Sequence, residues 1–306
     1  MKYNERKGKY NPYPPFRKLA MLNCMTTPPP GILDIVIHHP HELRGLSGVS
    51  ISFEKGVWRS EQFSRYLFRF LPEFALSYSE RQKINDQMSV EKLQRAAELV
   101  YATKKFENRG EFGELILHAL IRDLFRSNPA ISKIYYKDSH NSTVKGFDAV
   151  HIVQNKDSFE LWLGEAKFYE DINNAIGAVV GELKKHSDAE YLRREFALIT
   201  NKIDDTWEYA EKLRLLLNPD VSLDRIFDRV CIPVLLTYES DTVRNYNVLK
   251  SEYESLLKTE ILNHYNKFSK SDLPKDLKIH LVLFPLKDKK ELIKNLHGRL
   301  EAWQNI

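Results

Sequence analysis

Three residues lie in two short segments whose side chains could do chemistry together. Asp148 follows Lys-Gly-Phe, and Glu165 and Lys167 belong to the run Gly-Glu-Ala-Lys. Strand-forming residues surround both segments, and turn-forming residues separate them at positions 154–158, which predicts a β-hairpin. Two carboxylates and an ammonium group at the end of such a hairpin would suit a hard divalent cation such as Mg²⁺, which prefers carboxylate oxygens.

The register of the hairpin decides whether these side chains meet. Side chains of a strand alternate between its two faces. A symmetric turn at residues 156–157 places Asp148 directly opposite Glu165. Opposed side chains have Cβ atoms about 5 Å apart, and two like charges there are destabilising. We therefore expect a compensating cation at this pair, with Lys167 beside it.

An amphipathic helix is expected before the hairpin, over residues 108–125. Its apolar residues recur at helical spacing and mark the side that packs on the sheet. Glu114 belongs to that side, near the N-terminal end of the helix. Either its charge simply interacts with the helix dipole, or it is a third acidic group aimed at the hairpin site. Glu114 is the first candidate for this role, and Glu111 is the second.

The remaining pattern predicts an α/β chain with a mixed central sheet. From residue 108 to 200 the expected order is helix, strand, strand, strand, helix, strand, an αβββαβ core. Besides the hairpin and the first helix, this core takes strands at 131–136 and 195–200 and a helix at 171–186. Beyond it we expect helices at 206–217, 243–268 and 289–303, and strands at 230–238 and 278–284.

The first third of the chain contains no catalytic group that the sequence reveals. Its pattern predicts an irregular arm at 1–31, strands at 32–37 and 49–53, and helices at 60–75 and 80–105. We therefore expect two regions. Residues 1–105 form a mainly helical N-terminal region that could dock a partner, and residues 106–306 form the domain that contains the hairpin and a C-terminal extension of its sheet.

The hairpin residues carry a resemblance to a known superfamily. Asp148 followed by Glu165-Ala166-Lys167 resembles the Asp…Glu-x-Lys signature of the PD-(D/E)xK nucleases, with Phe147 in place of the usual proline. This resemblance implies a restriction-endonuclease-like α+β core and metal-dependent hydrolysis of phosphodiester bonds. Asp148, Glu165 and Lys167 would be the catalytic residues.

The same resemblance implies a set of metal ligands. In this superfamily an acidic residue of the first core helix often joins the metal shell, a role that falls on Glu114. With Asp148, Glu165 and the main-chain carbonyl of Ala166, it would hold Mg²⁺, with Mn²⁺ as the alternative. Lys167 would orient the attacking water or stabilise the developing negative charge.

Three segments carry a closer resemblance. Arg-Gly-Glu-Phe-Gly-Glu-Leu-Ile-Leu-His from Arg109, Lys-Gly-Phe-Asp from Lys145 and Leu-Gly-Glu-Ala-Lys-Phe-Tyr from Leu163 resemble HamA, the nuclease subunit of Hachiman-type bacterial anti-phage systems. The resemblance covers residues 100–306 best. It implies a cytoplasmic effector that cuts DNA and is held in complex with a superfamily 2 helicase, HamB, until infection.

Composition sets limits on these interpretations. The net charge of +4 for 306 residues permits nucleic-acid binding without requiring it. No apolar run approaches the roughly 20 residues that span a membrane, and two distant cysteines, Cys24 and Cys231, fit a reducing cytoplasm. Two alternatives to an active nuclease stay open: a catalytically inert nuclease fold that binds nucleic acid, and a subunit whose main task is to clamp the helicase.

Overall fold

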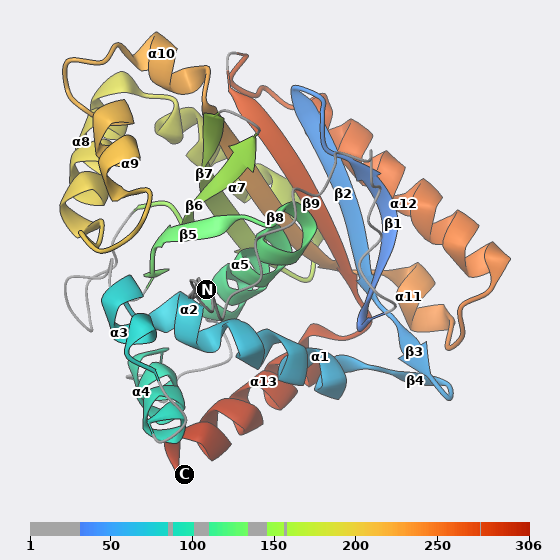
Figure 1. The fold of residues 1–306 in the computed structure, drawn as a ribbon. Coiled ribbons are helices and arrows are strands. Elements are labelled where there is room, and N and C mark those ends of the chain that lie inside the picture. The colour runs from blue at the N-terminus through green and yellow to red at the C-terminus, as the bar shows by residue number, and fades with distance from the viewer. Residues whose placement is uncertain (1–30, 85–87, 101–109, 134–145, 156–157, 276) are drawn as a thin grey trace, which may run out of the picture.

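One mixed β-sheet organises the chain (Figure 1). The computed structural model describes residues 31–84, 88–100, 110–133, 146–155, 158–275 and 277–306. These residues form a seven-stranded sheet in the order β1-β2-β9-β8-β7-β6-β5 and a two-stranded ribbon, β3-β4. The strands are β1 (Leu33–His39), β2 (Arg44–Ile51), β3 (Phe53–Glu54), β4 (Val57–Trp58), β5 (Asn128–Ile131), β6 (Ala149–Asn155), β7 (Ser158–Phe168), β8 (Val230–Glu239) and β9 (Lys278–Leu286).

The helices divide into an N-terminal group and a group that connects or follows the central strands. The first comprises α1 (Ser60–Leu67), the 3₁₀ turn η1 (Phe68–Phe70), α2 (Leu71–Ala75), α3 (Tyr78–Gln82) and α4 (Ser89–Val100). The second comprises α5 (Glu111–Phe125), α7 (Ile172–His186), α8 (Ala189–Lys202), α9 (Ala210–Leu216), α10 (Leu223–Phe227), α11 (Asp241–Asn245), α12 (Ser251–Ser269) and α13 (Lys289–Gln304).

The centre of the sheet is parallel and the two sides are antiparallel. β2, β9, β8 and β7 run parallel to one another, whereas β1 pairs antiparallel with β2, and β6 pairs antiparallel with both β7 and β5. β8 is buried along nearly its whole length, as expected for a parallel strand that is covered on both faces. Continuous apolar sequence therefore identifies the middle of the sheet.

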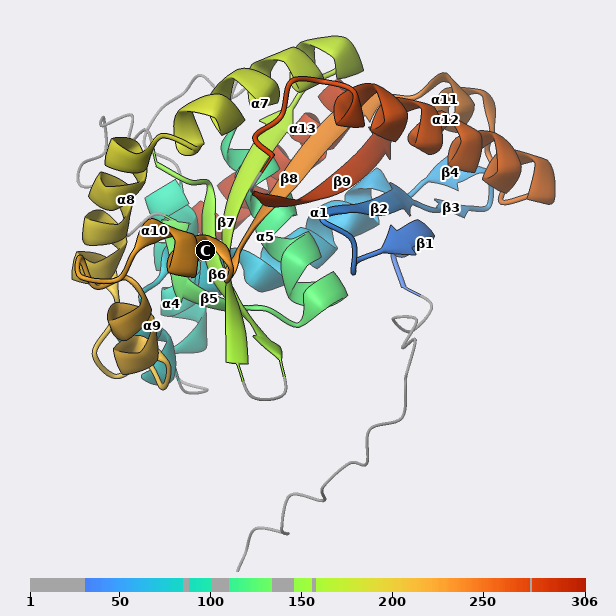
Figure 2. The same ribbon diagram turned by 90° about the horizontal axis from the view of Figure 1, so that it is seen from above.

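Helices cover both faces of the sheet (Figure 2). α5 and α1 lie on one face, and α7 and α12 lie on the other. Close packing requires small residues at two crossings: a Cβ at Gly164 would lie 2.8 Å from the Leu117 side chain of α5, and one at Gly48 would lie 2.8 Å from Ile261 of α12. The helix that contains Glu114 is thereby pressed against the strand that contains Glu165.

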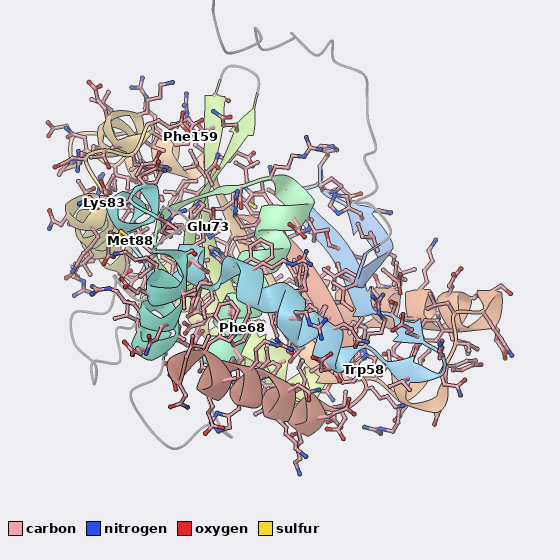
Figure 3. All side chains as sticks on the ribbon, turned by 60° about the horizontal axis from the view of Figure 1, so that its bottom comes forward. Trp58, Phe68, Glu73, Lys83, Met88 and Phe159 are labelled. Carbon is pink, nitrogen blue, oxygen red and sulfur yellow. The ribbon has the colours of Figure 1, made fainter. Side chains whose placement is uncertain are left out.

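The N-terminal region shares the sheet and the core of the rest of the chain. β1 and β2 extend the main sheet beside β9, and α1 packs against α13. Phe68, labelled in Figure 3, meets Trp303 of α13 edge to face with ring centroids 5.2 Å apart. Strands from both sides of residue 105 belong to one sheet, and the functional division at that residue stays a prediction.

The predicted α+β fold with a mixed central sheet is confirmed, but several predicted elements are wrong. The predicted strand 195–200 lies within helix α8, where Leu192, Phe196 and Ile199 are buried at helical spacing. The strand that follows α7 in the sheet is therefore β8, reached only after α8, α9 and α10. The period of the buried residues, rather than their strand propensity, decides this segment.

The other errors concern boundaries. The predicted helix 80–105 is two helices, because α3 ends at Gln82 and α4 begins only at Ser89. The predicted strand 131–136 begins earlier, as β5 at Asn128, and ends at Ile131; residues 134–136 lie outside the described part. The predicted helix 243–268 is two helices, because the chain is extended at Tyr246 after α11 and at Lys250 before α12. None of the helices in the described ranges is long and apolar enough to cross a membrane.

Candidate active site

The hairpin that carries the predicted site forms in the expected register. Val150 pairs with Leu163, and Asn155 pairs with Ser158 across residues 156–157, which lie outside the described part. The main-chain N–H of Asp148, just before β6, donates to the Gly164 carbonyl at 2.8 Å. Asp148 is therefore held beside β7 at the position from which it can face Glu165.

Two specific contacts fix the Asp148 carboxylate. Its Oδ2 accepts a hydrogen bond from the main-chain N–H of Ala166 at 2.9 Å. Its Oδ1 accepts one from the Lys133 ammonium at 3.0 Å, and the same ammonium donates to the Phe147 carbonyl at 3.1 Å. The predicted catalytic aspartate is thus hydrogen-bonded to the main chain of Ala166, the residue between Glu165 and Lys167 on β7.

Glu165 and Lys167 lie on the face of β7 that helix α7 covers. Glu165 is only 3% exposed; its Oε1 lies 3.1 Å from Nδ1 of His186, and its Oε2 lies 3.8 Å from Nζ of Lys167. Lys167 also forms an ion pair with Glu182, one turn before His186 on α7. Helix α7 therefore supplies an acid and an imidazole that complete the surroundings of the two predicted catalytic residues.

The buried carboxylates of the site repel one another. Burial raises the pKa of Glu165 well above its usual value, and the negative charge of Asp148 raises it further. Burial alone would lower the pKa of Lys167, but its hydrogen bond to Glu182 and the charge of Glu165 outweigh burial and raise it. This part of the site holds more negative than positive charge, so an added cation would be stabilised there.

Lys133 links the predicted helix residue to the hairpin. Its Nζ lies 3.7 Å from Oε1 of Glu114 and 3.0 Å from Oδ1 of Asp148, and its side chain is almost fully buried. Burial would lower the pKa of this ammonium, but the carboxylates of Glu114 and Asp148 raise it above its usual value. Glu114 therefore points toward the Asp148 side of its helix, as expected from its place on the apolar stripe.

Aromatic side chains close one side of the site. The ring of Phe147 lies 4.5 Å from that of His186, and the His186 ring stacks on Tyr191 of α8 with centroids 4.9 Å apart. Burial lowers the pKa of His186 to about 4, so its imidazole is neutral at physiological pH. Phe147 thus helps to hold a neutral histidine against Glu165.

The donor groups present fit a magnesium ion that keeps much of its own water. The described residues contain no group of three His, Cys, Asp or Glu side chains that would hold a metal by themselves. Mg²⁺, however, is often bound through one or two carboxylates together with water and substrate phosphate oxygens. Asp148 and Glu165 are two such carboxylates. Burial and the negative charge of Asp148 raise the pKa of Glu165, so a nearby cation would stabilise its charged form.

Sequence reasoning placed Asp148, Glu165 and Lys167 together but missed three neighbours. Lys133 follows β5, and the pattern offered no sign that its ammonium is buried. Glu182 and His186 are four residues apart on α7, a spacing that puts them on one helix face. The sequence already shows this spacing. It could have identified Glu182 and His186 as neighbours of the site if helix α7 had been predicted to pack across the hairpin.

One comparison with known proteins gives a family. Residues 31–300 match the family HamA, so the match includes the hairpin, α5, α7 and the strands on both sides of the sheet. No curated protein matches the chain.

Proposed function

Since the chain belongs to the HamA family, we propose that it is the nuclease subunit of a Hachiman-type anti-phage defence complex. In this proposal it hydrolyses phosphodiester bonds of DNA with Mg²⁺ and belongs to the PD-(D/E)xK superfamily. Asp148, Glu165 and Lys167 are its catalytic residues, and a helicase of the HamB type is its partner. Family membership supports a role in the defence complex, and the hairpin site supports the hydrolysis of phosphodiester bonds.

The observation that carries the proposal is the position of two carboxylates and a lysine at the end of buried strands. In a surface ion-pair cluster these groups would be exposed to water, and their positive and negative charges would balance. Here burial and the charge of Asp148 raise the pKa of Glu165, and Lys167 forms ion pairs with both Glu165 and Glu182. Burying surplus carboxylate destabilises a fold, so such clusters are typical of functional sites.

Each side chain has a role that follows from its contacts. Asp148 and Glu165 are the primary ligands for the divalent cation, with Glu114 as a further acidic group near Asp148. The main-chain N–H and C=O of one strand residue point to the same side of the strand. Because the Ala166 N–H binds Asp148, the Ala166 carbonyl also points toward Asp148, where it is a further ligand for the cation. Lys167 is placed beside Glu165 to orient a water or to stabilise charge on the phosphate.

A bound divalent cation would supply positive charge to the scissile phosphate and lower the pKa of the attacking water. The protein supplies the rest of the site. Phe147 and Tyr191 limit the access of water on the α7 side, and His186, neutral at physiological pH, contacts Glu165 without adding charge. Lys133 holds the Asp148 carboxylate in place through its hydrogen bond.

A helicase partner fits the charge of the chain. Neutralisation of phosphates by lysine and arginine supplies most of the non-specific affinity of proteins for DNA. A net charge of +4 is modest for a chain that must hold duplex DNA alone. We therefore propose that the isolated protein cuts DNA weakly and that the helicase brings the substrate and controls cleavage.

The test compares the purified chain with and without the helicase encoded beside it. Plasmid DNA, linear DNA and RNA are incubated with Mg²⁺ or EDTA, in the presence of ATP, using wild type and Glu165→Gln. We expect cleavage of DNA that needs Mg²⁺, an intact Glu165 and the helicase. Absence of cleavage in every sample would favour the inert, helicase-clamping alternative. Equally vigorous cutting by the isolated chain would rule out helicase control.

A further inference from the structure

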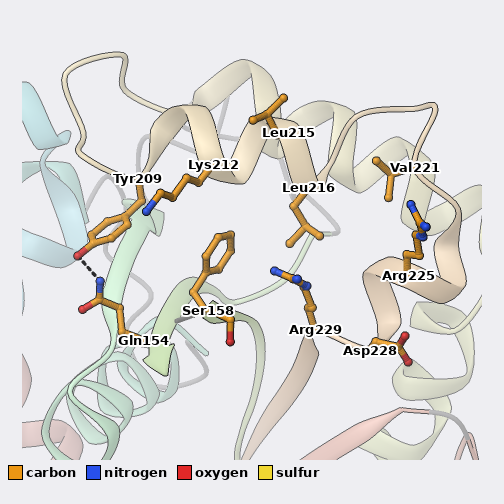
Figure 4. A pocket seen from close by; sticks show the side chains of 11 residues that line it. Gln154, Ser158, Tyr209, Lys212, Leu215, Leu216, Val221, Arg225, Asp228 and Arg229 are labelled. Carbon is orange, nitrogen blue, oxygen red and sulfur yellow. Dashed lines mark hydrogen bonds between the residues drawn. The ribbon is translucent and has the colours of Figure 1, made fainter. Parts of the chain in front are cut away.

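A second candidate site lies at the opposite end of the catalytic hairpin. A pocket of about 730 Å³ opens between the hairpin end, at Gln154 and Phe159, and the segment that contains α9 and α10. Figure 4 shows it from close by. Its volume lies within the roughly 300–1,000 Å³ range of small-ligand sites, which is far more room than a lone inorganic anion requires.

Positive charge dominates the side chains that line this pocket. Lys212 projects from α9, while Arg225 of α10 and Arg229 just before β8 enter from the other side (Figure 4). In the described part of the chain none of these three cations forms an ion pair. Asp228 is the one carboxylate among the lining residues, so a surplus of positive charge faces the hollow. Cations without ion-pair partners that are spread along one hollow suit the phosphate groups of a nucleotide or strand.

Other arginines of the same region show that this lack of partners is specific. Arg214 also belongs to α9, but it pairs with Asp205 and donates to the Ile203 carbonyl at 2.9 Å. Arg193 of α8 donates to the Val221 carbonyl at 2.8 Å. The two neighbouring guanidinium groups thus each bond to a protein oxygen, whereas those at the pocket are exposed and form no ion pair in the described part of the chain.

The pocket also has apolar and hydrogen-bonding walls. Phe159, Leu215 and Leu216 line it, and Leu215 is 63% exposed although it is apolar. The Gln154 amide donates to the Tyr209 hydroxyl at 2.6 Å, which ties the hairpin to α9 and leaves the Gln154 carbonyl oxygen available. An aromatic or apolar surface next to a polar edge is how proteins bind a nucleobase.

This pocket is separate from the candidate active site. Phe159 and Glu165 belong to the same face of β7, so at about 3.3 Å per residue their Cα atoms lie roughly 20 Å apart. Leu161 and Leu163, both fully buried, lie between them. A ligand in the pocket therefore cannot touch the metal-binding carboxylates.

We propose that this pocket binds a nucleotide unit, with its phosphate groups on Lys212, Arg225 and Arg229 and its base against Phe159 and Leu216. The unit is either a nucleotide of a single strand or a free nucleotide, since both present the same chemistry. The inference goes beyond the proposed nuclease activity and does not depend on it, because binding here requires neither a metal nor cleavage.

The test measures binding by the full-length chain in EDTA, where no metal-dependent cutting occurs. Fluorescence anisotropy follows a labelled single-stranded oligothymidylate, with wild type, Arg225→Ala/Arg229→Ala and Leu215→Glu. We expect the double variant to bind at least about tenfold more weakly, and its slope of log K against log salt to fall by about 1.4, since each phosphate contact contributes roughly 0.7 for single strands. Leu215→Glu, at an exposed position, should weaken binding without disturbing the core.

A matched control removes two exposed charges elsewhere. Lys258→Ala/Lys294→Ala on α12 and α13 lowers the net charge equally and should change affinity less than twofold. If loss of overall charge explained binding, both double variants would weaken it alike, which would overturn the proposal. Unchanged binding by a folded Arg225→Ala/Arg229→Ala variant would also overturn it.

Competition then distinguishes the sources of the nucleotide. Displacement of the label by unlabelled oligothymidylate, with little effect of ATP, supports a strand site, and displacement by ATP at lower concentration supports a free nucleotide. Inorganic phosphate that competes as well as either would show a simple anion site and would contradict the role of the base wall. Cleavage assays of the same variants report on the proposed nuclease separately.

Discussion

Helix α5 contacts two partly buried charge clusters, and their balance of charge differs. In the first, the Glu73 cluster, the Glu73 carboxylate faces Arg122 at 2.8 Å, Arg81 at 3.3 Å and His118 at 3.5 Å. His118 in turn lies 3.0 Å from His151 of β6. The cluster joins α2 and α3 to α5 and the sheet, and Figure 3 shows Glu73 between the N-terminal helices and the core.

The second, the Asp148 cluster, surrounds the candidate active site. It contains the carboxyl groups of Glu114, Asp148, Glu165 and Glu182, against the ammonium groups of Lys133 and Lys167. In the Glu73 cluster one carboxylate faces two guanidinium groups, whereas here four carboxyl groups share two cations. The same helix therefore takes part in one cluster with enough positive charge and one without it.

The pKa values show what this difference means. Burial alone would raise the pKa of Glu73, but His118 and Arg122 outweigh burial and lower it to about 2. In the Asp148 cluster, burial and the charge of Asp148 raise the pKa of Glu165. Glu73 thus stabilises the fold as an anion, whereas Glu165 as an anion destabilises it. A balanced cluster holds elements together, and a cluster that lacks cations is fitted to receive one.

The largest expected effect is on catalysis. Glu165→Gln or Lys167→Ala should reduce DNA cleavage at least about 100-fold, because each removes a charged group from the site proposed to stabilise the transition state. Cleavage by the complex with the helicase, with Mg²⁺ and ATP, is the measurement.

Glu170→Gln is the matched control for that experiment. Glu170 is exposed, just beyond the end of β7, and its replacement should leave the cleavage rate within about twofold of wild type. Wild-type rates for Glu165→Gln or Lys167→Ala would show that the active site lies elsewhere in the chain.

The next effect is on stability, and it should separate the two clusters. Glu73→Gln should lower the free energy of unfolding by about 2 kcal/mol, because hydrogen bonds to charged groups are lost and two guanidinium groups keep their burial. Glu165→Gln, measured by urea unfolding in EDTA at pH 7.5, should lower it little or raise it, since a neutral side chain relieves the repulsion from Asp148. An equal loss of unfolding free energy in Glu73→Gln and Glu165→Gln would contradict the proposed difference between the two clusters.

A smaller effect concerns Lys133. Lys133→Met should slow cleavage about tenfold, roughly 1.4 kcal/mol, because the Asp148 carboxylate loses one of the two hydrogen bonds that hold it. Lys133→Arg keeps the charge and should recover part of the rate. The dependence of the cleavage rate on Mg²⁺ concentration distinguishes a variant in which Asp148 is misplaced but still binds the cation from one in which Asp148 no longer binds it. A wild-type rate for Lys133→Met would show that Asp148 needs no such support.

The smallest expected effect is the pH dependence of the Glu73 cluster. The folded-state pKa of Glu73 is about 2, below its ordinary value of 4.5, so the unfolded chain takes up a proton first as pH falls. The stability that Glu73 contributes is complete above pH 4.5 and decreases below it, by about 1 kcal/mol between pH 4.5 and 3.5. The difference in unfolding free energy between wild type and Glu73→Gln should shrink by that amount, and a constant difference would contradict the lowered pKa.

The sequence by itself determined the hairpin and the residues at its end. Alternation of side chains along two strands and a two-residue turn leave one symmetric register, and that register brings Asp148 to the Glu165–Lys167 segment. It also determined α5 and the central strand β8, because an apolar stripe and a continuous apolar run each repeat over many residues. Local periodicity suffices for features of this kind.

Only the tertiary structure decided what surrounds those residues. Lys133, Glu182 and His186 reach the site because β5, β6, β7 and α7 pack together, and no local pattern gives that packing. Residues 195–200 could have been a strand by propensity, yet they are helical because Leu192, Phe196 and Ile199 all face the core. Charge balance at a buried site depends on every element that borders it, and only the complete fold brings those elements together.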